Sequence, residues 1–374
     1  MKKLFTPGPT EVPSDVLAAL STETMHHRTD EFRDVMQEIS EGLAYAFRTK
    51  TEPVAFTSSG SGAMEAVVAG LFSPGEKVLA VVGGKFGERW RDLSRAYGLD
   101  VTEYAVKWGT SPDPDELLSF AKENGPFAAL FLTQSETSTG TLKDVEAIAS
   151  RFEGSGTLLI VDSVTALGVH ELLPDDWGLD AVVAGSQKAF MCPPGLGFAW
   201  LSERAWERTA TSTLPKYYFS LTKARESLSK YLTPFTPAVP LFLGLRQSLA
   251  RMRGEGIEAI WKRHDALGRG ARAGVRALGL SLFSEAPANG VTAVVAPPEI
   301  GGDAIRADLL DAHGFRLAGG QSHLKDKIFR IGHLGFYETA DIADVLRALE
   351  TVLSKRGWSD ADGAAVKAAE AEWK

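Results

Sequence analysis

Short apolar runs alternate with helical patterns along the first half of the chain, and this alternation restricts the fold more than any other feature of the sequence. A strand, a helix and a second strand in that order are typical of a parallel sheet, because the chain has to cross back over the sheet between two parallel strands. The sequence therefore predicts an α/β fold in which a large, mostly parallel sheet is flanked by helices on both faces. We expect its strands at residues 53–57, 77–82, 127–132, 157–162, 180–184 and 196–201, and its helices near 62–72, 86–97, 114–123, 144–153 and 203–210.

Other segments predict the remaining parts of the molecule. Residues 1–16 are rich in proline and should form an extended arm, and apolar residues at helical spacing predict one amphipathic helix over 30–48. A long helical stretch near 240–278 leads into a second pattern of strands and helices, and the tail after Gly357 predicts a final helix or a frayed end. We expect an N-terminal arm at 1–16 that packs with the small domain, a large domain at 17–262 and a smaller C-terminal α+β domain at 263–374, with strands near 291–295 and 327–331 and helices near 302–313 and 340–353.

The composition argues against several classes of function. The chain has 374 residues, of which 44 % are hydrophobic and 24 % charged, and its formal net charge is −8 without a block of Lys or Arg. We therefore expect neither nucleic acid nor a membrane as a partner. The single cysteine, Cys192, excludes an intramolecular disulfide and a cysteine-based metal site, and the scattered histidines predict no metal site either. No stretch approaches the roughly 20 apolar residues of a membrane span, so we expect a cytoplasmic enzyme.

Lys188 and Asp162 form the pair on which the functional prediction depends. Asp162 closes one apolar run, at 158–162, and Lys188 lies just after the next run, at 181–184. Chemistry with pyridoxal 5'-phosphate needs such a pair, because a lysine amine forms a Schiff base with the cofactor aldehyde and a carboxylate holds the pyridine nitrogen protonated. Each residue alone is more often a surface charge or a helix cap. The prediction therefore rests on the rest of the site.

Other segments supply further parts of such a site. The glycine-rich turn at 57–62 follows a strand and opens a helix, so its backbone amides could bind a phosphate, or it could be only a flexible connection. Phe86 could stack on the cofactor ring or be an ordinary core residue. Thr137, after the next strand, could bind the cofactor's phenolic oxygen or belong to a polar loop. Arg330 lies in an apolar run and could bind a substrate carboxylate or a structural acid.

The chain resembles the class V aminotransferases, which are fold-type I pyridoxal phosphate enzymes. It looks closest to the branch of alanine–glyoxylate, serine–pyruvate and serine–glyoxylate aminotransferases, and the resemblance runs from end to end. It is carried by Thr6-Pro7-Gly8-Pro9-Thr10, Ser59-Gly60-Ser61-Gly62, Glu136-Thr137-Ser138-Thr139-Gly140, Val161-Asp162-Ser163, Gly185-Ser186-Gln187-Lys188-Ala189 with Pro193-Pro194-Gly195, and Phe329-Arg330-Ile331-Gly332.

The resemblance implies a role for each matching residue. Lys188 would be the Schiff-base lysine, Asp162 the partner of the pyridine nitrogen, and Arg330 the carboxylate site. Thr236 would reach the phosphate of a neighbouring subunit's cofactor, while Thr233 falls where some relatives place a tyrosine, and such contacts imply a homodimer with composite active sites. The other expected contacts are Ser61, Gly62, Ala63 (a histidine in some relatives) and Gln187 with the phosphate, Phe86 and Thr137 with the cofactor, and Gly8 beside the substrate.

The resemblance further implies transamination from a small amino acid, alanine or serine, to glyoxylate or pyruvate. Aspartate or 2-aminoethylphosphonate is the alternative donor if Arg28 or the pair His26 and His27 reaches the mouth of the site and reads a distal acidic group. A lyase similar to the cysteine desulfurases is a further alternative. Those enzymes carry a histidine before the lysine, where this chain has Gln187. A cofactor-free subunit of a larger complex is also conceivable, and a missing cofactor absorbance would support it.

Overall fold

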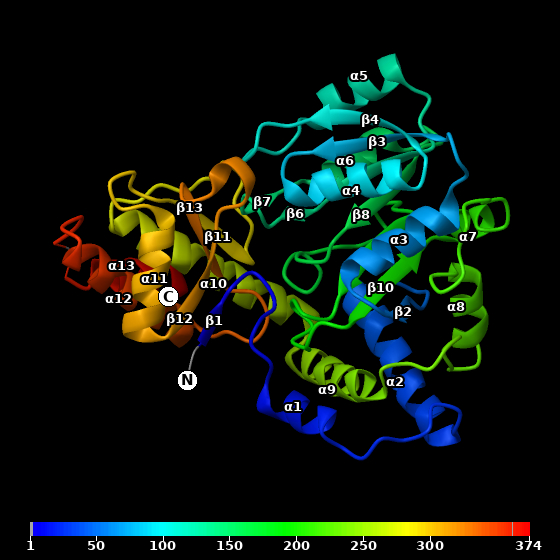
Figure 1. Ribbon diagram of the computed structural model, residues 1–374, viewed down its shortest axis with the longest axis horizontal. Coiled ribbons are helices and arrows are strands. Elements are labelled where there is room, and N and C mark those ends of the chain that lie inside the picture. Colours follow the sequence, from blue (N-terminus) through cyan, green and yellow to red (C-terminus); the bar gives the residue numbers. More distant parts are fainter. Residues whose placement is uncertain (1–2, 361) are drawn as a thin grey trace.

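The computed structural model of the protein describes residues 3–360 and 362–374. Within these residues a seven-stranded sheet and a four-stranded sheet lie at opposite ends of the molecule, and helix α10 (Ile257–Ala277) runs between them (Figure 1). The first two residues of the predicted arm and residue 361 of the predicted tail lie outside the described residues.

The large sheet is mostly parallel, as the alternation in the sequence predicted. Its order is β2-β10-β9-β8-β5-β3-β4, and β10 alone among these strands runs in the opposite direction to the others. The edge strand β4 was not predicted, because half of its residues are polar and none of them is buried. The strands are β2 (Val54–Thr57), β3 (Lys77–Val82), β4 (Asp100–Ala105), β5 (Ala129–Thr133), β8 (Leu158–Asp162), β9 (Ala181–Gly185) and β10 (Leu196–Leu201).

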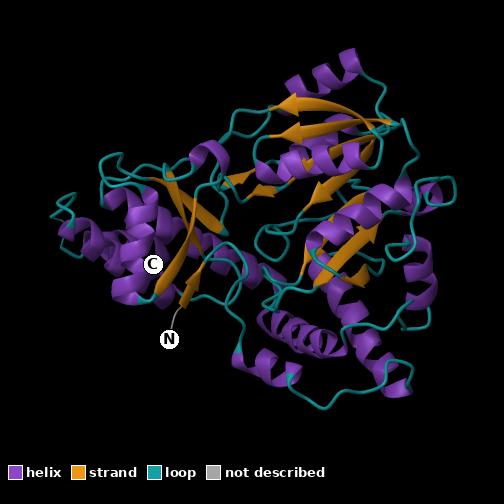
Figure 2. Cartoon of the chain, in the orientation of Figure 1, coloured by secondary structure: helices purple, strands orange, loops and turns teal. Residues whose placement is uncertain are grey.

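Helices cover both faces of this sheet (Figure 2). Successive strand residues face opposite sides, so Ile160 belongs to one hydrophobic core and Val161 to the other. The core of Val161 is closed by α2 (Asp30–Phe47), α5 (Pro114–Asn124), α6 (Val145–Phe152) and α9 (Val239–Glu255). The core of Ile160 is closed by α3 (Gly60–Leu71), α4 (Lys85–Ala96), α7 (Glu203–Arg208) and α8 (Leu221–Leu228).

The small sheet pairs one strand from the N-terminal arm with three strands from the C-terminal part of the chain. Its order is β1-β12-β13-β11, and β1 pairs in parallel with β12 in the register Lys3↔Phe315. Phe5 is fully buried between the rings of Phe315 and Tyr337, at centroid distances of 5.2 and 5.5 Å. The elements are β1 (Lys3–Phe5), β11 (Val291–Val295), β12 (Phe315–Gly319) and β13 (Ile328–Gly332), with α11 (Gly302–His313), α12 (Thr339–Lys355), α13 (Ala364–Trp373) and the 3-10 turn η1 (Ser322–Leu324). A short hairpin, β6 (Ser135–Glu136) and β7 (Thr141–Leu142), follows β5.

Two sequence predictions were wrong. The arm does not stay extended to residue 16, because helix α1 (Ser14–Leu20) begins within it and buries Val16 against α9. The predicted helix over 240–278 is two helices, because Gly256 takes a φ of +87°, which ends α9 and starts α10 in a new direction. The predicted domain boundary between residues 262 and 263 falls inside α10 and stays a prediction.

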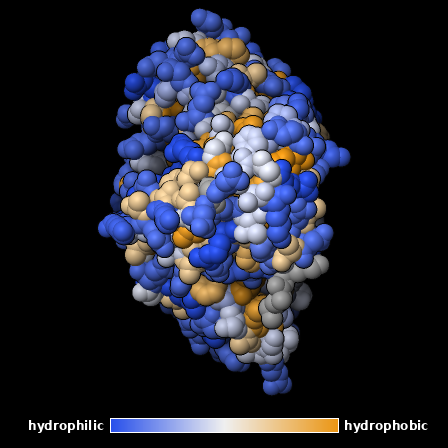
Figure 3. Space-filling model, turned by 90° about the vertical axis from the view of Figure 1, so that its left-hand side faces the viewer, coloured by the Kyte–Doolittle hydropathy of each residue, from blue (hydrophilic) through white to orange (hydrophobic). Residues whose placement is uncertain are grey.

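The outer surface at the small-sheet end is mainly hydrophilic, with apolar residues in small, separate areas (Figure 3). Among residues 3–360 and 362–374, no helix is both long and apolar enough to cross a membrane.

Replacing Phe5 by alanine should lower the free energy of unfolding by about 3–4 kcal/mol, because a fully buried aromatic ring is lost between two others. Urea denaturation followed by tryptophan fluorescence measures the change. Leu17→Ala is the matched control, because Leu17 is 48 % exposed and should cost little. Equal stability of the two variants would mean that β1 adds nothing to the small sheet's core.

Candidate active site

The carboxyl ends of five strands meet at one edge of the large sheet. Strands β3, β5, β8 and β9 are parallel, and β2 runs the same way because β10 is antiparallel to both β2 and β9. Open α/β sheets bind their ligands at this edge. The structure brings to it the glycine-rich turn after β2, Phe86 after β3, Thr137 after β5, Asp162 at the end of β8 and Lys188 after β9.

Lys188 is buried under the N-terminal arm. Its Nζ donates a hydrogen bond to the carbonyl of Pro7 at 2.5 Å, and its own carbonyl accepts one from Thr10 Oγ1 at 3.1 Å. Gly8, between them, has a φ of +120°, and a Cβ atom built on it would lie 2.3 Å from Lys188 Nζ. Glycine is therefore required at position 8 for the arm to pass over the lysine.

Asp162 and Lys188 are both removed from water. Burial raises the pKa of Asp162 to about 6, while the backbone N–H of Val164, which donates to Oδ1 at 2.9 Å, acts against this rise. Burial lowers the pKa of Lys188 to about 8, and the negative charge of Asp162 opposes this change. Each charge thus favours the ionised form of the other, and desolvation disfavours both.

The first turn of α3 leaves backbone donors free. Ser59 provides no side-chain cap, and the amides of Gly60 and Ser61 have no acceptor among the described residues. The amides of Gly62 and Ala63 instead donate to the carbonyl of Ser59, at 2.9 and 3.2 Å. Of the three predicted phosphate contacts in this turn, Ser61, Gly62 and Ala63, only Ser61 therefore has a free amide.

Gln187 lies beside this turn. A Cβ atom built on Gly185 would lie 3.1 Å from Gln187 Oε1 and 3.4 Å from the amide nitrogen of Gly60, so both groups border the same space. Oε1 is buried without a hydrogen-bond partner among the described atoms. Such groups are rare in folded proteins, and this one is available to a ligand.

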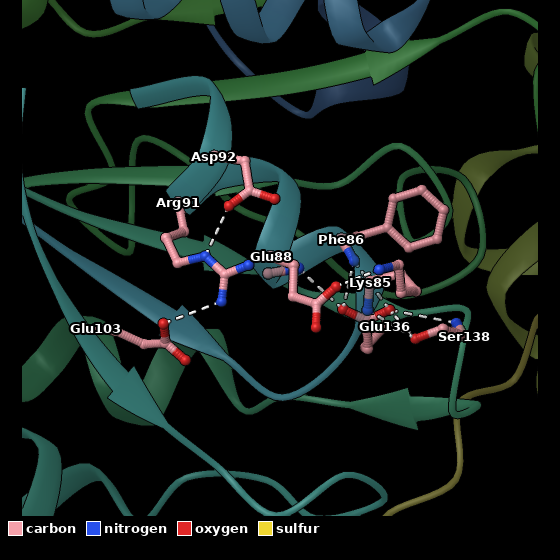
Figure 4. A network of polar contacts seen from close by, with 9 residues as sticks. Lys85, Phe86, Glu88, Arg91, Asp92, Glu103, Glu136 and Ser138 are labelled. Atoms are coloured by element: carbon pink, nitrogen blue, oxygen red, sulfur yellow. Dashed lines mark hydrogen bonds and ion pairs between the residues drawn. The ribbon is translucent and has the colours of Figure 1, made fainter. Parts of the chain in front are cut away.

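Glu136 organises the opposite side of the edge, a role that the sequence did not reveal. Its buried carboxylate accepts hydrogen bonds from the backbone N–H groups of Phe86 and Gly87, at 3.0 and 3.1 Å, and from Ser138 (Figure 4). These amides form the start of α4, where the helix dipole favours a negative charge. Figure 4 shows the ring of Phe86 projecting away from this carboxylate, so Glu136 fixes the backbone from which the ring extends.

Thr137 and Arg330 connect the two sheets. Arg330, in β13, is buried and donates to the carbonyls of Thr137 and Gly319 at 2.8 and 3.0 Å. Burial lowers its pKa to about 10, and it forms no ion pair within the described part of the chain. Thr137 Oγ1 is buried and also lacks a partner there. A guanidinium and a hydroxyl are thus available side by side.

Lys143 is a second buried lysine that the sequence reasoning missed. Its Nζ donates to the carbonyl of Thr133 at 3.1 Å, next to Asp162 in the β5–β8 pairing. Burial lowers its pKa, and the carboxylates of Glu136 and Asp162 act in the opposite direction. No sequence pattern marks it, because a lysine between a short strand and a helix is usually solvated.

Two predicted groups have no contact with Lys188 among the described residues. Thr236 is exposed in the segment between α8 and α9, and no contact joins it to Lys188 among the described residues. Arg28, the candidate reader of a distal acidic group, donates to the carbonyl of Thr233 at 3.0 Å, and the rings of His26 and His27 lie 4.9 Å apart and are tilted by 35°.

Cys192 does not have the properties of a reactive thiol. It is 1 % exposed, and burial raises its pKa to about 12. A desulfurase needs an accessible thiolate, so the predicted alternative of a cysteine-dependent lyase finds no nucleophile here.

Comparison with known proteins identifies the family to which the chain belongs. The family described as "Aminotransferase class-V" matches residues 3–341. The chain belongs to the class V aminotransferases. This enzyme is 42 % identical to a protein of Synechococcus sp. named "Soluble hydrogenase, small subunit", over 98 % of its own length and 97 % of the relative's. It is 32 % identical to an L-aspartate–glyoxylate aminotransferase of Paracoccus denitrificans (99 % and 96 %) and 31 % identical to a serine–glyoxylate aminotransferase of Methylorubrum extorquens (98 % and 94 %).

Solved structures of aminotransferases share the whole fold. The ureidoglycine–glyoxylate aminotransferase of Bacillus subtilis superposes with a TM-score of 0.95 at 30 % identity, covering 100 % of this chain and 98 % of that one. The alanine–glyoxylate aminotransferase of a Nostoc species gives 0.90 at 31 % identity, covering 94 % and 95 %. The predicted fold-type I architecture is thereby confirmed.

Replacing Glu136 by glutamine should lower the free energy of unfolding by about 1.5–3 kcal/mol, because charge-assisted hydrogen bonds to the start of α4 are lost inside the protein. Thermal unfolding measures the loss. Glu103→Gln, which removes a surface ion pair with Arg91 (Figure 4), is the control and should cost about 1 kcal/mol or less. A Glu136 variant as stable as this control would contradict the capping role.

Proposed function

We propose that this aminotransferase uses pyridoxal 5'-phosphate, held on Lys188, to transfer the amino group of alanine or serine to glyoxylate or pyruvate. One observation carries the proposal. A buried lysine and a buried aspartate lie at the edge of the large sheet, and a buried arginine of the small sheet, which has no acidic partner among the described residues, contacts this edge at Thr137. These are the groups that a cofactor aldehyde, a pyridine nitrogen and a substrate carboxylate require.

The residues at the edge fit this cofactor. The free amides of Gly60 and Ser61 suit a phosphate, since they add to the positive end of the α3 dipole. The unpaired Thr137 Oγ1 can donate to a phenolic oxygen, and Asp162 suits a protonated ring nitrogen. Gln187 and the first turn of α3, with Ser61, Gly62 and Ala63, would surround the phosphate, and Phe86 would cover the ring.

When bound, pyridoxal phosphate supplies an aldehyde that exchanges amino groups and a ring that accepts the electrons of the broken Cα–H bond. Arg330 binds the substrate carboxylate and directs the Cα–H bond towards Lys188. The lowered pKa of Lys188 leaves a useful fraction of its Nζ neutral near pH 7, so this amine can take the proton from Cα and later return it. Pro7 and Gly8 close the site above the amine and exclude water.

The choice of substrates rests on the relatives and on Arg28. The aminotransferases reported above differ in their named donors, aspartate, serine, ureidoglycine and alanine, but glyoxylate is common to their names. The Arg28 guanidinium donates to the carbonyl of Thr233 and has no contact with Lys188, Asp162 or Arg330 among the described residues, which favours a donor without a distal acidic group. Aspartate and 2-aminoethylphosphonate remain the alternative donors.

The hydrogenase name of one relative does not supply a second proposal. An iron–sulfur cluster is ordinarily held by several cysteine thiolates, and this chain has one cysteine, which is buried.

A homodimer is part of our proposal, because Thr236 lies exposed beside exposed Tyr217 and Tyr218 and would need a second subunit to reach a cofactor. A cytoplasmic location stays a prediction.

The visible spectrum of the purified protein tests the function directly. Alanine or serine should remove the absorption band of the lysine-bound cofactor, and glyoxylate or pyruvate should restore it. Aspartate and 2-aminoethylphosphonate are added separately for comparison. A band that none of the four donors changes would exclude the proposed substrates, and a protein that takes up no pyridoxal phosphate would exclude the cofactor.

In cofactor-free protein, the rate at which added pyridoxal phosphate attaches to Lys188 should rise with pH and level off slightly above pH 8. Only the neutral amine is nucleophilic, and burial lowers its pKa from 10.5 to about 8. Stopped-flow absorbance measures the rate, and the same reaction with a free lysine derivative corrects for titration of the cofactor. A rate that still rises at pH 10 would contradict the lowered pKa. Lys188→Ala should remove the band and leave the fold intact.

Replacing Arg330 by alanine should raise the KM for the amino donor by about 30-fold or more, which corresponds to about 2 kcal/mol of lost binding free energy. Steady-state kinetics measure the change, and the cofactor band should persist. Arg316→Ala is the control, because Arg316 is exposed on the neighbouring strand β12. An unchanged donor KM would place the carboxylate site elsewhere.

A further inference from the structure

Arg89 lies over the same space as the proposed cofactor site, although the sequence reasoning did not select it. It follows Phe86 by three residues on α4, so the two side chains leave the same face of the helix. Its guanidinium lies 4.7 Å from the centroid of the Phe86 ring, and its Nη1 donates to Ser61 Oγ at 3.0 Å. One cation therefore links the aromatic after β3 with the first turn of α3.

Two of the other three cations of α4 have acidic partners, whereas Arg89 has none among the described residues. Lys85 pairs with Glu88, and Arg91 pairs with Asp92 and Glu103. Arg89 is in no ion pair within residues 3–360 and 362–374, and its hydrogen-bond acceptor there is a neutral hydroxyl. Its charge does reach the site, because it lowers the pKa values of both Asp162 and Lys188.

A phosphate at the first turn of α3 would bring nearly two negative charges to a place with few donors. The free amides of Gly60 and Ser61 supply hydrogen bonds and part of a helix dipole but no full charge. The guanidinium of Arg89 is already hydrogen-bonded to Ser61 and has further N–H groups that point to no described acceptor. Its planar fork matches two phosphate oxygens.

We propose that Arg89 binds the phosphate group of the cofactor and is the main source of positive charge for it. This inference rests on the proposed use of pyridoxal phosphate. It goes further in two ways. It adds to the phosphate site a residue of α4, which lies outside the glycine-rich turn. It also states that the ligand of Arg89 is the phosphate of the cofactor and not the distal group of a substrate.

The test compares two ligands that differ only in the phosphate. Cofactor-free wild-type protein, Arg89→Met and Arg89→Lys are titrated with pyridoxal phosphate and with pyridoxal, and the absorbance of the lysine-bound form gives the dissociation constants. Arg95→Met is the matched control, since Arg95 is exposed on the same helix and lies away from Phe86. Circular dichroism confirms that each variant is folded.

Arg89→Met should weaken binding of pyridoxal phosphate about 10- to 100-fold, the loss expected for charge-assisted hydrogen bonds. Binding of pyridoxal should be unchanged, Arg89→Lys should recover part of the loss, and Arg95→Met should match the wild type.

Equal weakening of the binding of both ligands would overturn the inference, because Arg89 would then act on the ring or the fold. If Arg89→Met leaves the binding of pyridoxal phosphate unchanged but raises the KM for aspartate more than the KM for alanine, the inference is overturned, because Arg89 would then bind the distal group of a substrate. Wild-type protein that binds neither ligand would overturn both this inference and the proposed function, whereas tight wild-type binding with an unaffected variant would overturn this inference alone.

Discussion

The close approach of the N-terminal arm to Lys188 is the contact on which the arrangement of the site depends. The lysine can lie beneath the arm because position 8 has no side chain, and its Nζ then meets the carbonyl of Pro7. The same arm passes Gly332 so closely that a Cβ atom there would lie 2.3 Å from the carbonyl oxygen of Thr6. Since Gly332 ends the strand that carries Arg330, the arm sets the distance between the amine of one sheet and the guanidinium of the other.

The second constraint is the burial of charge. Glu136, Asp162, Lys143, Lys188 and Arg330 are all nearly inaccessible to water, and burying unpaired charges costs several kcal/mol each. The backbone offsets much of this cost: amides of α4 solvate Glu136, and carbonyls of Pro7, Thr133, Thr137 and Gly319 accept from the cations. Dipoles stabilise a charge without neutralising it, so the site keeps its electrostatic attraction for charged ligands.

Local pattern was sufficient to predict the large sheet and the residues at its edge. The strands of that sheet, apart from β4, are short apolar runs; Asp162 ends one of them, and Lys188 lies three residues after another. The contributions of Glu136, Lys143 and Arg89 depend on how separate segments meet, and no single-sequence pattern states which polar side chain will be buried. Phe86 and Arg89 do have helical i, i+3 spacing, which was a usable signal. The sequence does not distinguish Gly256, where the helix breaks, from a glycine inside a helix, because its positive φ is set by the packing of α9 and α10.

The parallel pairing of β1 with β12 has a consequence for how the protein is made. Strand β1 pairs with β12, which lies more than 300 residues later in the sequence. During translation β1 therefore cannot pair until β12 has left the ribosome. Contacts between such distant segments form late, because closing a long loop is entropically costly. The large sheet can fold earlier, with Lys188 still open to solvent above its edge. The cover over the lysine, like the strand that carries Arg330, is therefore completed after the large sheet, and the large sheet can form while its reactive amine is still accessible.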